Sequence, residues 1–244
     1  EKYRFEPISS CEKKINQLHD SFLNWRTTSV EVKEELLNEL AKNLTENQHN
    51  ISSIISSDMG KPIRESEREV QKCIQCCQFY ADNAALIHSK LTKNNGYRSP
   101  VGVVMGIMPW NFPLWQLIRF LVPAIVVGNT CAIKPAYNTY RIALKLIECA
   151  PLGSSIMDCI LPTDSTTSSL ISFPTVAGIS FTGSVTVGKQ IGQLAAVNFK
   201  PCVLELGGSD PFLIFKGADL NSALDAAVNA RFSNAGQTCI SAKR

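Results

Sequence analysis

Apolar residues recur every three or four positions through roughly the first ninety residues of the chain, the period of a helix with one buried face. We predict one long helix over residues 31–55 and a second over residues 65–91. Thr28 and Glu31 have the spacing of a capping box at the start of the first helix. The positions of that helix that repeat at a spacing of four are Val32, Leu36, Leu40 and Leu44.

From residue 100 onward the pattern changes to short apolar runs that alternate with amphipathic segments. This alternation predicts βαβ units, and therefore an α/β fold with a doubly wound, Rossmann-like parallel sheet preceded by N-terminal helices. The expected strands are 101–108, 130–134, 156–161, 176–181, 201–206 and 212–215, and the expected helices are 113–127, 139–149, 185–197 and 220–231.

The same change of pattern suggests three parts. Residues 1–98 would be a helical segment that packs on the next part, and residues 99–232 a dinucleotide-binding domain. Residues 233–244 would be the start of a further, catalytic domain.

Composition narrows the functional classes. The chain has 244 residues, of which 45% are hydrophobic and 18% charged, with a net charge of +3. The charge is mild and forms no basic stripe, which argues against nucleic acid as a partner. Because the sequence has no apolar run long enough to cross a bilayer and no signal peptide at Glu1, we expect no membrane association and a cytoplasmic location.

The nine cysteines are odd in number and irregularly spaced, which favours reduced thiols. Cys73, Cys76 and Cys77 form a C-x-x-C-C motif that could suggest zinc. A structural zinc site needs four ligands, and no second motif or nearby histidine completes the set. We therefore predict no metal site there and interpret these cysteines as one face of a buried helix.

Chemistry is expected at the carboxyl ends of the parallel strands, where such sheets bind ligands. The predicted ends carry an amide at Asn111, a lysine at Lys134 and a carboxylate at Glu205. A lone cysteine, Cys239, follows a small polar loop that is typical of an exposed thiol. An amide can donate to an oxyanion and a carboxylate can activate water, so this set suits a reaction through a covalent thioester.

A cysteine–histidine pair has little support, because the three histidines all lie in the N-terminal helical region, at His19, His49 and His88. Residues 183–189 also match most of a P-loop, G-x-x-x-x-G-K. The next residue is Gln190, which lacks the hydroxyl that would hold magnesium. The milder interpretation is a helix N-terminus that receives a phosphate, with Gly183 allowing close approach and Ser184 acting as a cap or phosphate contact.

Four motifs in order resemble the aldehyde dehydrogenase superfamily, through nearly the whole chain. They are Met-Pro-Trp-Asn-Phe-Pro at 108–113, Phe-Thr-Gly-Ser at 181–184, Glu-Leu-Gly-Gly at 205–208 and Gly-Gln-Thr-Cys at 236–239. The sequence around Glu205 and after Cys239 is most similar to the short bacterial succinate-semialdehyde dehydrogenases.

The resemblance implies NAD(P)-dependent oxidation of a small-molecule aldehyde, with succinate semialdehyde as the expected substrate. Cys239 would attack the aldehyde carbon, Asn111 and the Cys239 backbone N–H would hold the oxyanion, and Glu205 would activate water. The resemblance also implies a cofactor site. Lys134 would contact the adenosine ribose, Ser184 with Gly183 the pyrophosphate, and Trp110 would line the cleft.

Arg119 lies at a position where semialdehyde-oxidising relatives hold the substrate's distal carboxylate, although an internal salt bridge is an equal alternative. Asn111 could instead cap the helix that begins near Pro113, and Lys134 could be a solvated lysine. Glu205 stands in an apolar run, where a buried carboxylate would be costly without a function. NAD-preferring relatives often carry a glutamate where this chain has Tyr137, so both NAD and NADP are admissible.

Members of the family extend well beyond Arg244, so we expect an incomplete chain in which the catalytic domain is largely missing and activity is weak or absent. The alternative is a non-catalytic nucleotide-binding fragment or pseudoenzyme. A homo-oligomer is expected for the full-length family.

Overall fold

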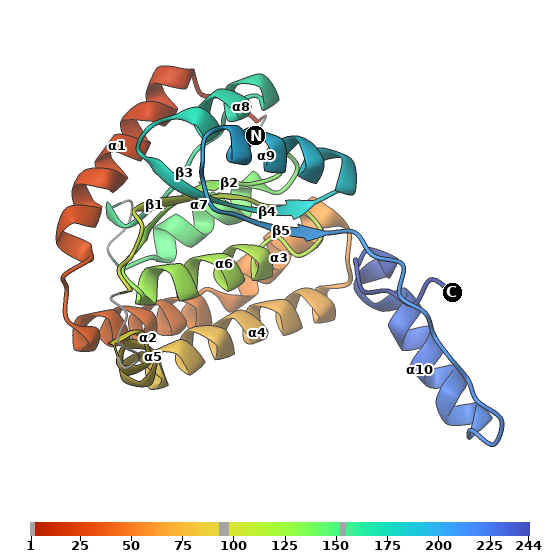
Figure 1. The fold of residues 1–244 in the computed structure, drawn as a ribbon. Helices are drawn as coiled ribbons and strands as arrows, with labels where there is room; N and C mark the ends of the chain where they lie inside the picture. Colours follow the sequence, from red (N-terminus) through yellow and green to blue (C-terminus); the bar gives the residue numbers. More distant parts are fainter. Residues whose placement is uncertain (1–2, 93–97, 152–154) are drawn as a thin grey trace.

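A parallel five-stranded sheet lies between two layers of helices in the computed structural model, which describes residues 3–92, 98–151 and 155–244 (Figure 1). The strand order is β3-β2-β1-β4-β5, and every pairing is parallel. The α/β sheet that the alternating pattern predicts is thus confirmed. The strands are β1 (Val103–Ile107), β2 (Thr130–Lys134), β3 (Met157–Cys159), β4 (Val176–Gly183) and β5 (Cys202–Leu206).

The direction of winding reverses at β1, which lies between β2 and β4. The register places Ile107 beside Lys134 on one side and Phe181 on the other. Ligands bind at such a switch point, outside the carboxyl ends of the strands. The fold therefore brings together the segments that follow β1, β2, β4 and β5.

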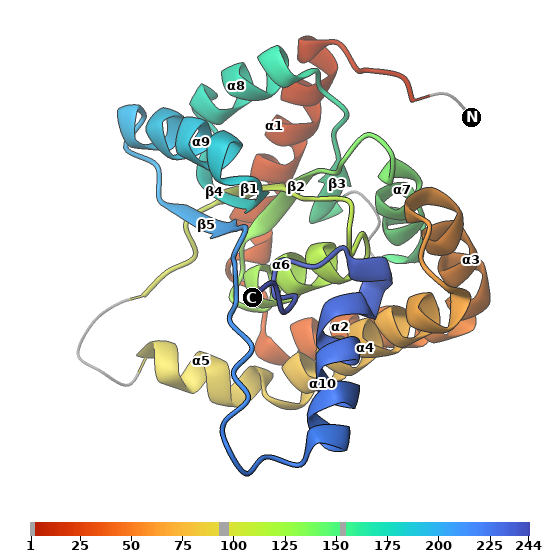
Figure 2. The ribbon, with the colours of Figure 1, turned by 90° about the vertical axis from the view of Figure 1, so that its right-hand side faces the viewer.

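One face of the sheet is covered by α1 (Ile8–Trp25), α8 (Asp164–Ser172) and α9 (Val185–Val197) (Figures 1 and 2). Their apolar faces and the side chains of β1 and β4 form one core cluster. Fully buried members of this cluster include Cys11, Ile15, Leu18, Met105 and Leu170.

The other face is covered by α6 (Trp115–Val126) and α7 (Tyr140–Cys149), with α2, α3, α4 and α5 packed behind them. Gly106 of β1 gives α6 its close approach, because a Cβ at this position would lie 2.4 Å from the Phe120 ring. The outer helices are α2 (Val30–Glu46), α3 (Gln48–Met59), α4 (Ile63–Asp82) and α5 (Ala84–Thr92).

The two long N-terminal helices that the periodicity predicts are each broken in two. The first breaks at Asn47 and the second at Asn83. Each of these asparagines donates its side-chain amide to the carbonyl four residues earlier, at 2.9 Å and 2.8 Å. This local bond competes with the continuing helix, whereas the apolar pattern runs through the break unchanged.

Two smaller expectations were also wrong, and one helix was not predicted. The N-cap of α2 is Ser29, so Thr28 makes no capping box and instead donates to the Asn24 carbonyl. Residues 212–215 form no strand. Helix α8 was missed because its first turns are rich in serine and threonine, although Thr163 caps it by accepting from the Thr166 N–H at 3.1 Å.

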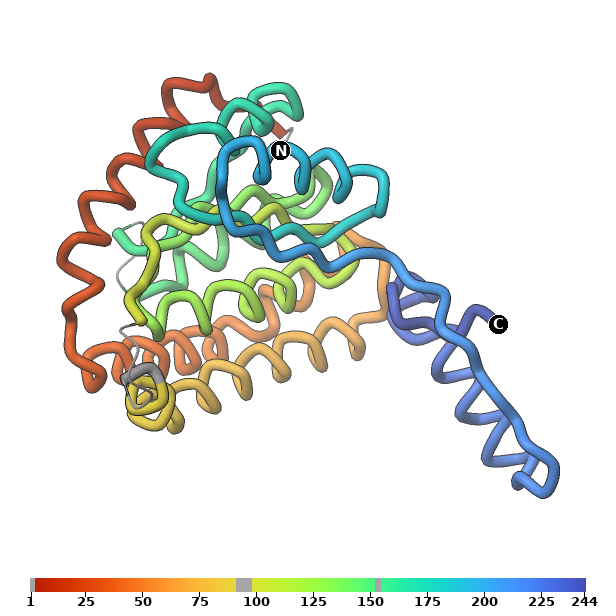
Figure 3. The backbone as a smooth tube through the Cα atoms, in the orientation of Figure 1, coloured from red at the N-terminus to blue at the C-terminus, as the bar shows by residue number. Residues whose placement is uncertain are grey.

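Residues 207–244 form an arm that extends away from the body of the molecule (Figures 1 and 3). The chain runs out along residues 207–219 and returns through α10 (Leu220–Phe232) and the short 3-10 helix η2 (Ser233–Gly236). No residue of α10 is buried. Among the described residues, no helix is long and apolar enough to cross a membrane.

The division into parts at residues 98 and 232 stays a prediction. Helices from the first part cover both faces of the sheet, since α1 lies on one side and α2 to α5 lie behind the other.

Candidate functional site

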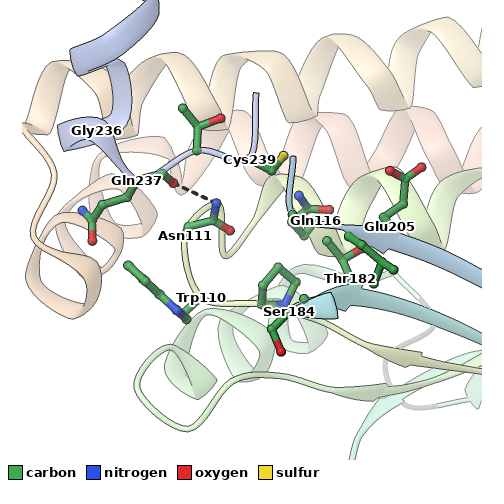
Figure 4. A pocket seen from close by; sticks show the side chains of 14 residues that line it. Trp110, Asn111, Gln116, Thr182, Ser184, Glu205, Gly236, Gln237 and Cys239 are labelled. Atoms are coloured by element: carbon green, nitrogen blue, oxygen red, sulfur yellow. Dashed lines mark hydrogen bonds between the residues drawn. The ribbon is translucent and has the colours of Figure 1, made fainter. Parts of the chain in front are cut away.

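Two adjoining pockets lie at the carboxyl edge of the sheet. One, of about 330 Å³, is lined by Asn111, Glu205 and Cys239 (Figure 4). The other, of about 640 Å³, is lined by Lys134 and the first residues of α9. They share the wall formed by Pro109, Trp110, Thr182, Gly183 and Ser184. Of the eight residues that the sequence assigned to catalysis, cofactor binding or substrate binding, seven line one of these pockets and Arg119 lines neither.

Cys239 is solvent-exposed, whereas the other eight cysteines, all within the described ranges, are buried or half-buried. It follows a sharp turn in which Asn234 and Ala235 both adopt left-handed backbone angles, with φ of 58° and 55°. Such angles cost free energy for residues other than glycine, so the surrounding contacts must hold the turn. The turn directs the loop of Cys239 into the smaller pocket (Figure 4).

Asn111 does not cap the helix that follows it. Helix α6 begins at Trp115, and Glu69 of α4 accepts from the Leu114 and Trp115 N–H groups at 2.9 and 2.8 Å. The Asn111 side chain instead donates to the Gln237 carbonyl at 2.8 Å (Figure 4). A primary amide has two N–H donors, so the second can serve a ligand in the pocket.

Glu205 is not buried, contrary to our expectation from its apolar run. Its side chain is 52% exposed and lies 2.6 Å from the Arg119 guanidinium. Strand β5 is the edge of the sheet, and its neighbouring apolar residues Val203 and Leu204 are also exposed to solvent. Arg119 therefore makes the internal salt bridge, and with Glu205 it lines a third pocket of about 370 Å³ beside the smaller one.

Lys134 ends β2 and lies at the floor of the larger pocket. Its ammonium is 4.3 Å from the Tyr137 ring centroid and 3.8 Å from the Asp164 carboxylate. Burial lowers the Lys134 pKa, and Asp164 opposes that shift in part. Tyr137 donates a short hydrogen bond to the same carboxylate.

The larger pocket suits a dinucleotide. Its volume lies within the range of cofactor sites, and it joins an apolar wall to a cation and a helix N-terminus. Ser184 is the N-cap of α9 and accepts from the Val187 N–H at 3.3 Å, which leaves its hydroxyl proton for a phosphate. Gly183 has a further reason to lack a side chain, because a Cβ there would lie 2.5 Å from the Phe181 ring. Lys189 lines neither pocket.

The sequence analysis did not identify three residues at the site. Gln116 of α6 is 6% exposed and lines the pocket between Cys239 and Glu205 (Figure 4). Asp164 supplies a carboxylate to the larger pocket from helix α8, which the sequence analysis did not predict. Asn234 is buried beneath the Cys239 loop. A polar residue at a helical core position is the signal that could have identified Gln116.

Cys73 and Cys77 are buried in the core and Cys76 is half-buried, as expected for a helix face that packs inward. Within the described residues, no cluster of histidine, cysteine, aspartate or glutamate could hold a metal ion. The described histidines lie on α1, α3 and α5, and none lines the two pockets.

A model of the aldehyde dehydrogenase family matches residues 8–244. The succinate semialdehyde dehydrogenase Sad of Escherichia coli (strain K12), named for NAD(P)+, is 35% identical over 232 residues, covering 91% of this chain and 50% of that protein. The NADP(+)-named succinate-semialdehyde dehydrogenase 1 of Mycobacterium tuberculosis (strain H37Rv) is 35% identical over 242 residues, covering 94% and 53%. The chain thus spans about half the length of the curated relatives it matches.

Solved structures are similar over nearly the whole chain. The succinic semialdehyde dehydrogenase of Streptococcus pyogenes, solved with NADP+, has a TM-score of 0.90 and 28% identity, covering 99% of this chain and 55% of that one. The lactaldehyde dehydrogenase of Escherichia coli has a TM-score of 0.89 and 27% identity, covering 98% and 52%.

Proposed function

Because the chain belongs to the aldehyde dehydrogenase family, we propose that its site oxidises an aldehyde to the carboxylic acid through a thioester on Cys239. Succinate semialdehyde is the proposed substrate, since the two curated relatives described above are named for it. The single observation that carries the proposal is one pocket lined by an exposed thiol, an amide and a carboxylate, beside a second pocket suited to a dinucleotide.

The chain's own residues supply three roles. The Cys239 sulfur attacks the aldehyde carbon, and the second N–H of Asn111 with the Cys239 backbone N–H donates to the oxygen that gains charge. Glu205, at the other side of the pocket, removes a proton from the water that hydrolyses the thioester. Its partner Arg119 occupies one carboxylate oxygen and leaves the other for that water.

NAD or NADP fits the larger pocket. When bound, the nicotinamide would supply the hydride acceptor that the oxidation of an aldehyde requires. Lys134 would attract a phosphate or hydrogen-bond the ribose, and Ser184 with the N-terminus of α9 would hold the pyrophosphate. Trp110 lies on the shared wall and would separate cofactor from thiol.

We further propose that this chain alone is a weak catalyst. The arm carries the proposed nucleophile, yet α10 buries no residue, and hydrogen bonds of polar side chains rather than an apolar core attach the loop of Cys239 to the body. The site can therefore be formed without being held rigidly enough for fast turnover.

The test is formation of reduced cofactor when the chain is mixed with succinate semialdehyde and NAD or NADP. We expect slow oxidation that Cys239→Ala abolishes, together with an acyl adduct on Cys239 in the intact mass of the wild type. Cys76→Ala, which removes a half-buried thiol away from both pockets, is the matched control. Oxidation that persists in Cys239→Ala would contradict the proposed nucleophile. Cofactor binding with no adduct and no oxidation would favour the non-catalytic alternative.

A further inference from the structure

Three buried polar side chains join the N-terminal helices to the loop of Cys239. Lys61 precedes α4, Glu69 lies on α4 and Asn234 lies in η2, and their residues are 3%, 4% and 4% exposed. Buried polar groups are costly unless each is paired, so their arrangement indicates a specific role. None of the three lines the pocket of Cys239.

Lys61 determines how the Asn234 amide is oriented. Its ammonium forms an ion pair with Glu69, donates to the Asn234 side-chain oxygen at 3.0 Å and lies 4.8 Å from the Phe112 ring centroid. An ammonium has donors only, so Asn234 must present its oxygen to Lys61 and its NH₂ group to the other side. That NH₂ group donates to the Asn111 carbonyl at 2.8 Å.

The same NH₂ group also donates to the Gln237 carbonyl, at 3.1 Å. This carbonyl is the one that accepts from the Asn111 side chain at 2.8 Å. The side-chain amides of Asn111 and Asn234 therefore both donate to the Gln237 carbonyl, two residues before Cys239. Together they secure a turn whose left-handed angles at Asn234 and Ala235 are costly on their own.

Glu69 fixes Asn111 from the opposite direction. One of its carboxylate oxygens pairs with Lys61, and the other accepts the N–H groups of Leu114 and Trp115 at the start of α6. Asn111 is thus held on its C-terminal side through the helix start and at its own carbonyl through Asn234. The Lys61–Glu69 ion pair therefore supports both contacts, because Lys61 binds Asn234 and Glu69 binds the start of α6.

We propose that Lys61, Glu69 and Asn234 are positioning residues that set the oxyanion donor Asn111 and the Cys239 loop in mutual register. The inference rests on the proposed function for the roles of Asn111 and Cys239. The contacts themselves predict, independently of any turnover, that the loop loses order when the Asn234 amide cannot donate.

The decisive variant is Asn234→Asp. A carboxylate keeps the volume and still accepts from Lys61, so the Lys61–Asn234 contact is preserved. It cannot donate to the carbonyls of Asn111 and Gln237, and it repels both. Lys61→Met is a poorer choice, because it would leave Glu69 charged, buried and unpaired, and the chain would be expected to unfold.

The matched control is Asn43→Asp. Asn43 of α2 also donates its amide to a distant carbonyl, that of Cys149, at 2.9 Å, but it lies away from both pockets. The two variants thus make the same substitution, one at a buried asparagine beside the loop and one at a half-buried asparagine remote from it.

Two measurements are made on each variant: kcat and KM for succinate semialdehyde, and amide hydrogen exchange of residues 236–240. In Asn234→Asp we expect kcat to fall about tenfold to a hundredfold with KM for the aldehyde nearly unchanged, since alignment rather than binding is lost. Exchange at residues 236–240 should rise about tenfold, with exchange in α6 unchanged. Asn43→Asp should change neither.

Unchanged exchange and unchanged kcat in Asn234→Asp would overturn the inference, as would equal effects in Asn43→Asp. If the wild type shows no oxidation, the proposed function of the isolated chain fails, and the exchange comparison alone decides whether the network positions the loop.

Discussion

The body of the molecule and its C-terminal arm are held together in different ways. In the body, residues 3–206, two continuous clusters of apolar side chains fill both faces of the sheet. In the arm, residues 207–244, the buried residues are both polar, Asn234 and Ser241, while most of its large apolar side chains are exposed. Those exposed side chains are Leu213, Ile214, Phe215, Leu220, Leu224, Val228, Phe232 and Ile240.

This difference shows how the site is divided. The body contributes every residue of the larger pocket, the proposed cofactor site, including Lys134 and Ser184, on strands and a helix that are fixed by burial. The arm contributes Cys239, the proposed nucleophile, and directional hydrogen bonds through Asn111 and Asn234 hold that part in place. Changes in the body should therefore alter stability or cofactor binding, and changes at the arm's attachment should alter chemistry.

The largest contrast should be in stability. Leu117 of α6 is 1% exposed and Leu224 of α10 is 62% exposed. We expect Leu117→Ala to lower the free energy of unfolding by about 2–5 kcal/mol, because it leaves a cavity in a packed core. Leu224→Ala should change it by less than about 0.5 kcal/mol. Urea unfolding of the two variants measures both values, and similar losses would mean that the arm is packed in solution.

The next largest effect separates chemistry from cofactor binding. Asn111→Ala removes the amide donor next to the arm, and we expect kcat to fall about 10²–10³-fold. The dissociation constant for NADP should stay the same, because Asn111 does not line the cofactor pocket. Steady-state kinetics measure the change in kcat, and cofactor titration measures the dissociation constant for NADP. Asn43→Ala is the control for loss of an asparagine amide. A weakened affinity for NADP would show that the two halves of the site are coupled.

The sequence also predicts the body and the arm to different extents. The body could be predicted well, because alternating apolar runs specify buried strands and β2 begins and ends at the expected residues. The errors in the body arose where a polar side chain acts on the backbone nearby, as Asn47 does in breaking one helix and Thr163 in starting another. The spacing of apolar residues does not depend on such hydrogen bonds, so it cannot predict them.

The arm could be predicted less well. Residues 212–215 have the composition of a strand, yet they lack a partner strand in the described structure. Glu205 and Arg119 lie 86 positions apart, so neither their ion pair nor the exposure of Glu205 on an edge strand is visible in local sequence. Motifs placed the site residues at the strand ends, whereas only the fold shows that Asn234 connects Asn111 to Lys61.

We expect a moderate effect on the preference between NAD and NADP from a substitution in the larger pocket, which the body forms. Asp164 holds a carboxylate near Lys134, in a pocket where Tyr137 replaces the glutamate expected of NAD-preferring relatives. A carboxylate favours ribose hydroxyls and repels a 2′-phosphate. We expect Asp164→Asn to raise the preference for NADP over NAD about tenfold, measured as the ratio of the two dissociation constants.

The reaction of Cys239 with iodoacetamide should be unchanged in Asp164→Asn, because Asp164 lies in the body and does not line the pocket of the thiol. A changed rate of alkylation would argue against two independently held halves.

The smallest effect concerns pH. Burial lowers the Lys134 pKa, so its ammonium loses the proton at a lower pH than an exposed lysine would. Since the neutral amine no longer attracts a phosphate, the dissociation constant for NADP should rise several-fold between about pH 7 and about pH 10. Lys134→Arg stays charged over this range and should show a flatter profile, whatever its absolute affinity. Asp164→Asn removes the group that raises the Lys134 pKa, so the loss of affinity should begin at lower pH. A wild-type profile as flat as that of Lys134→Arg would mean that Lys134 does not contact the cofactor. The body would then bind the cofactor through Ser184 and the α9 N-terminus instead.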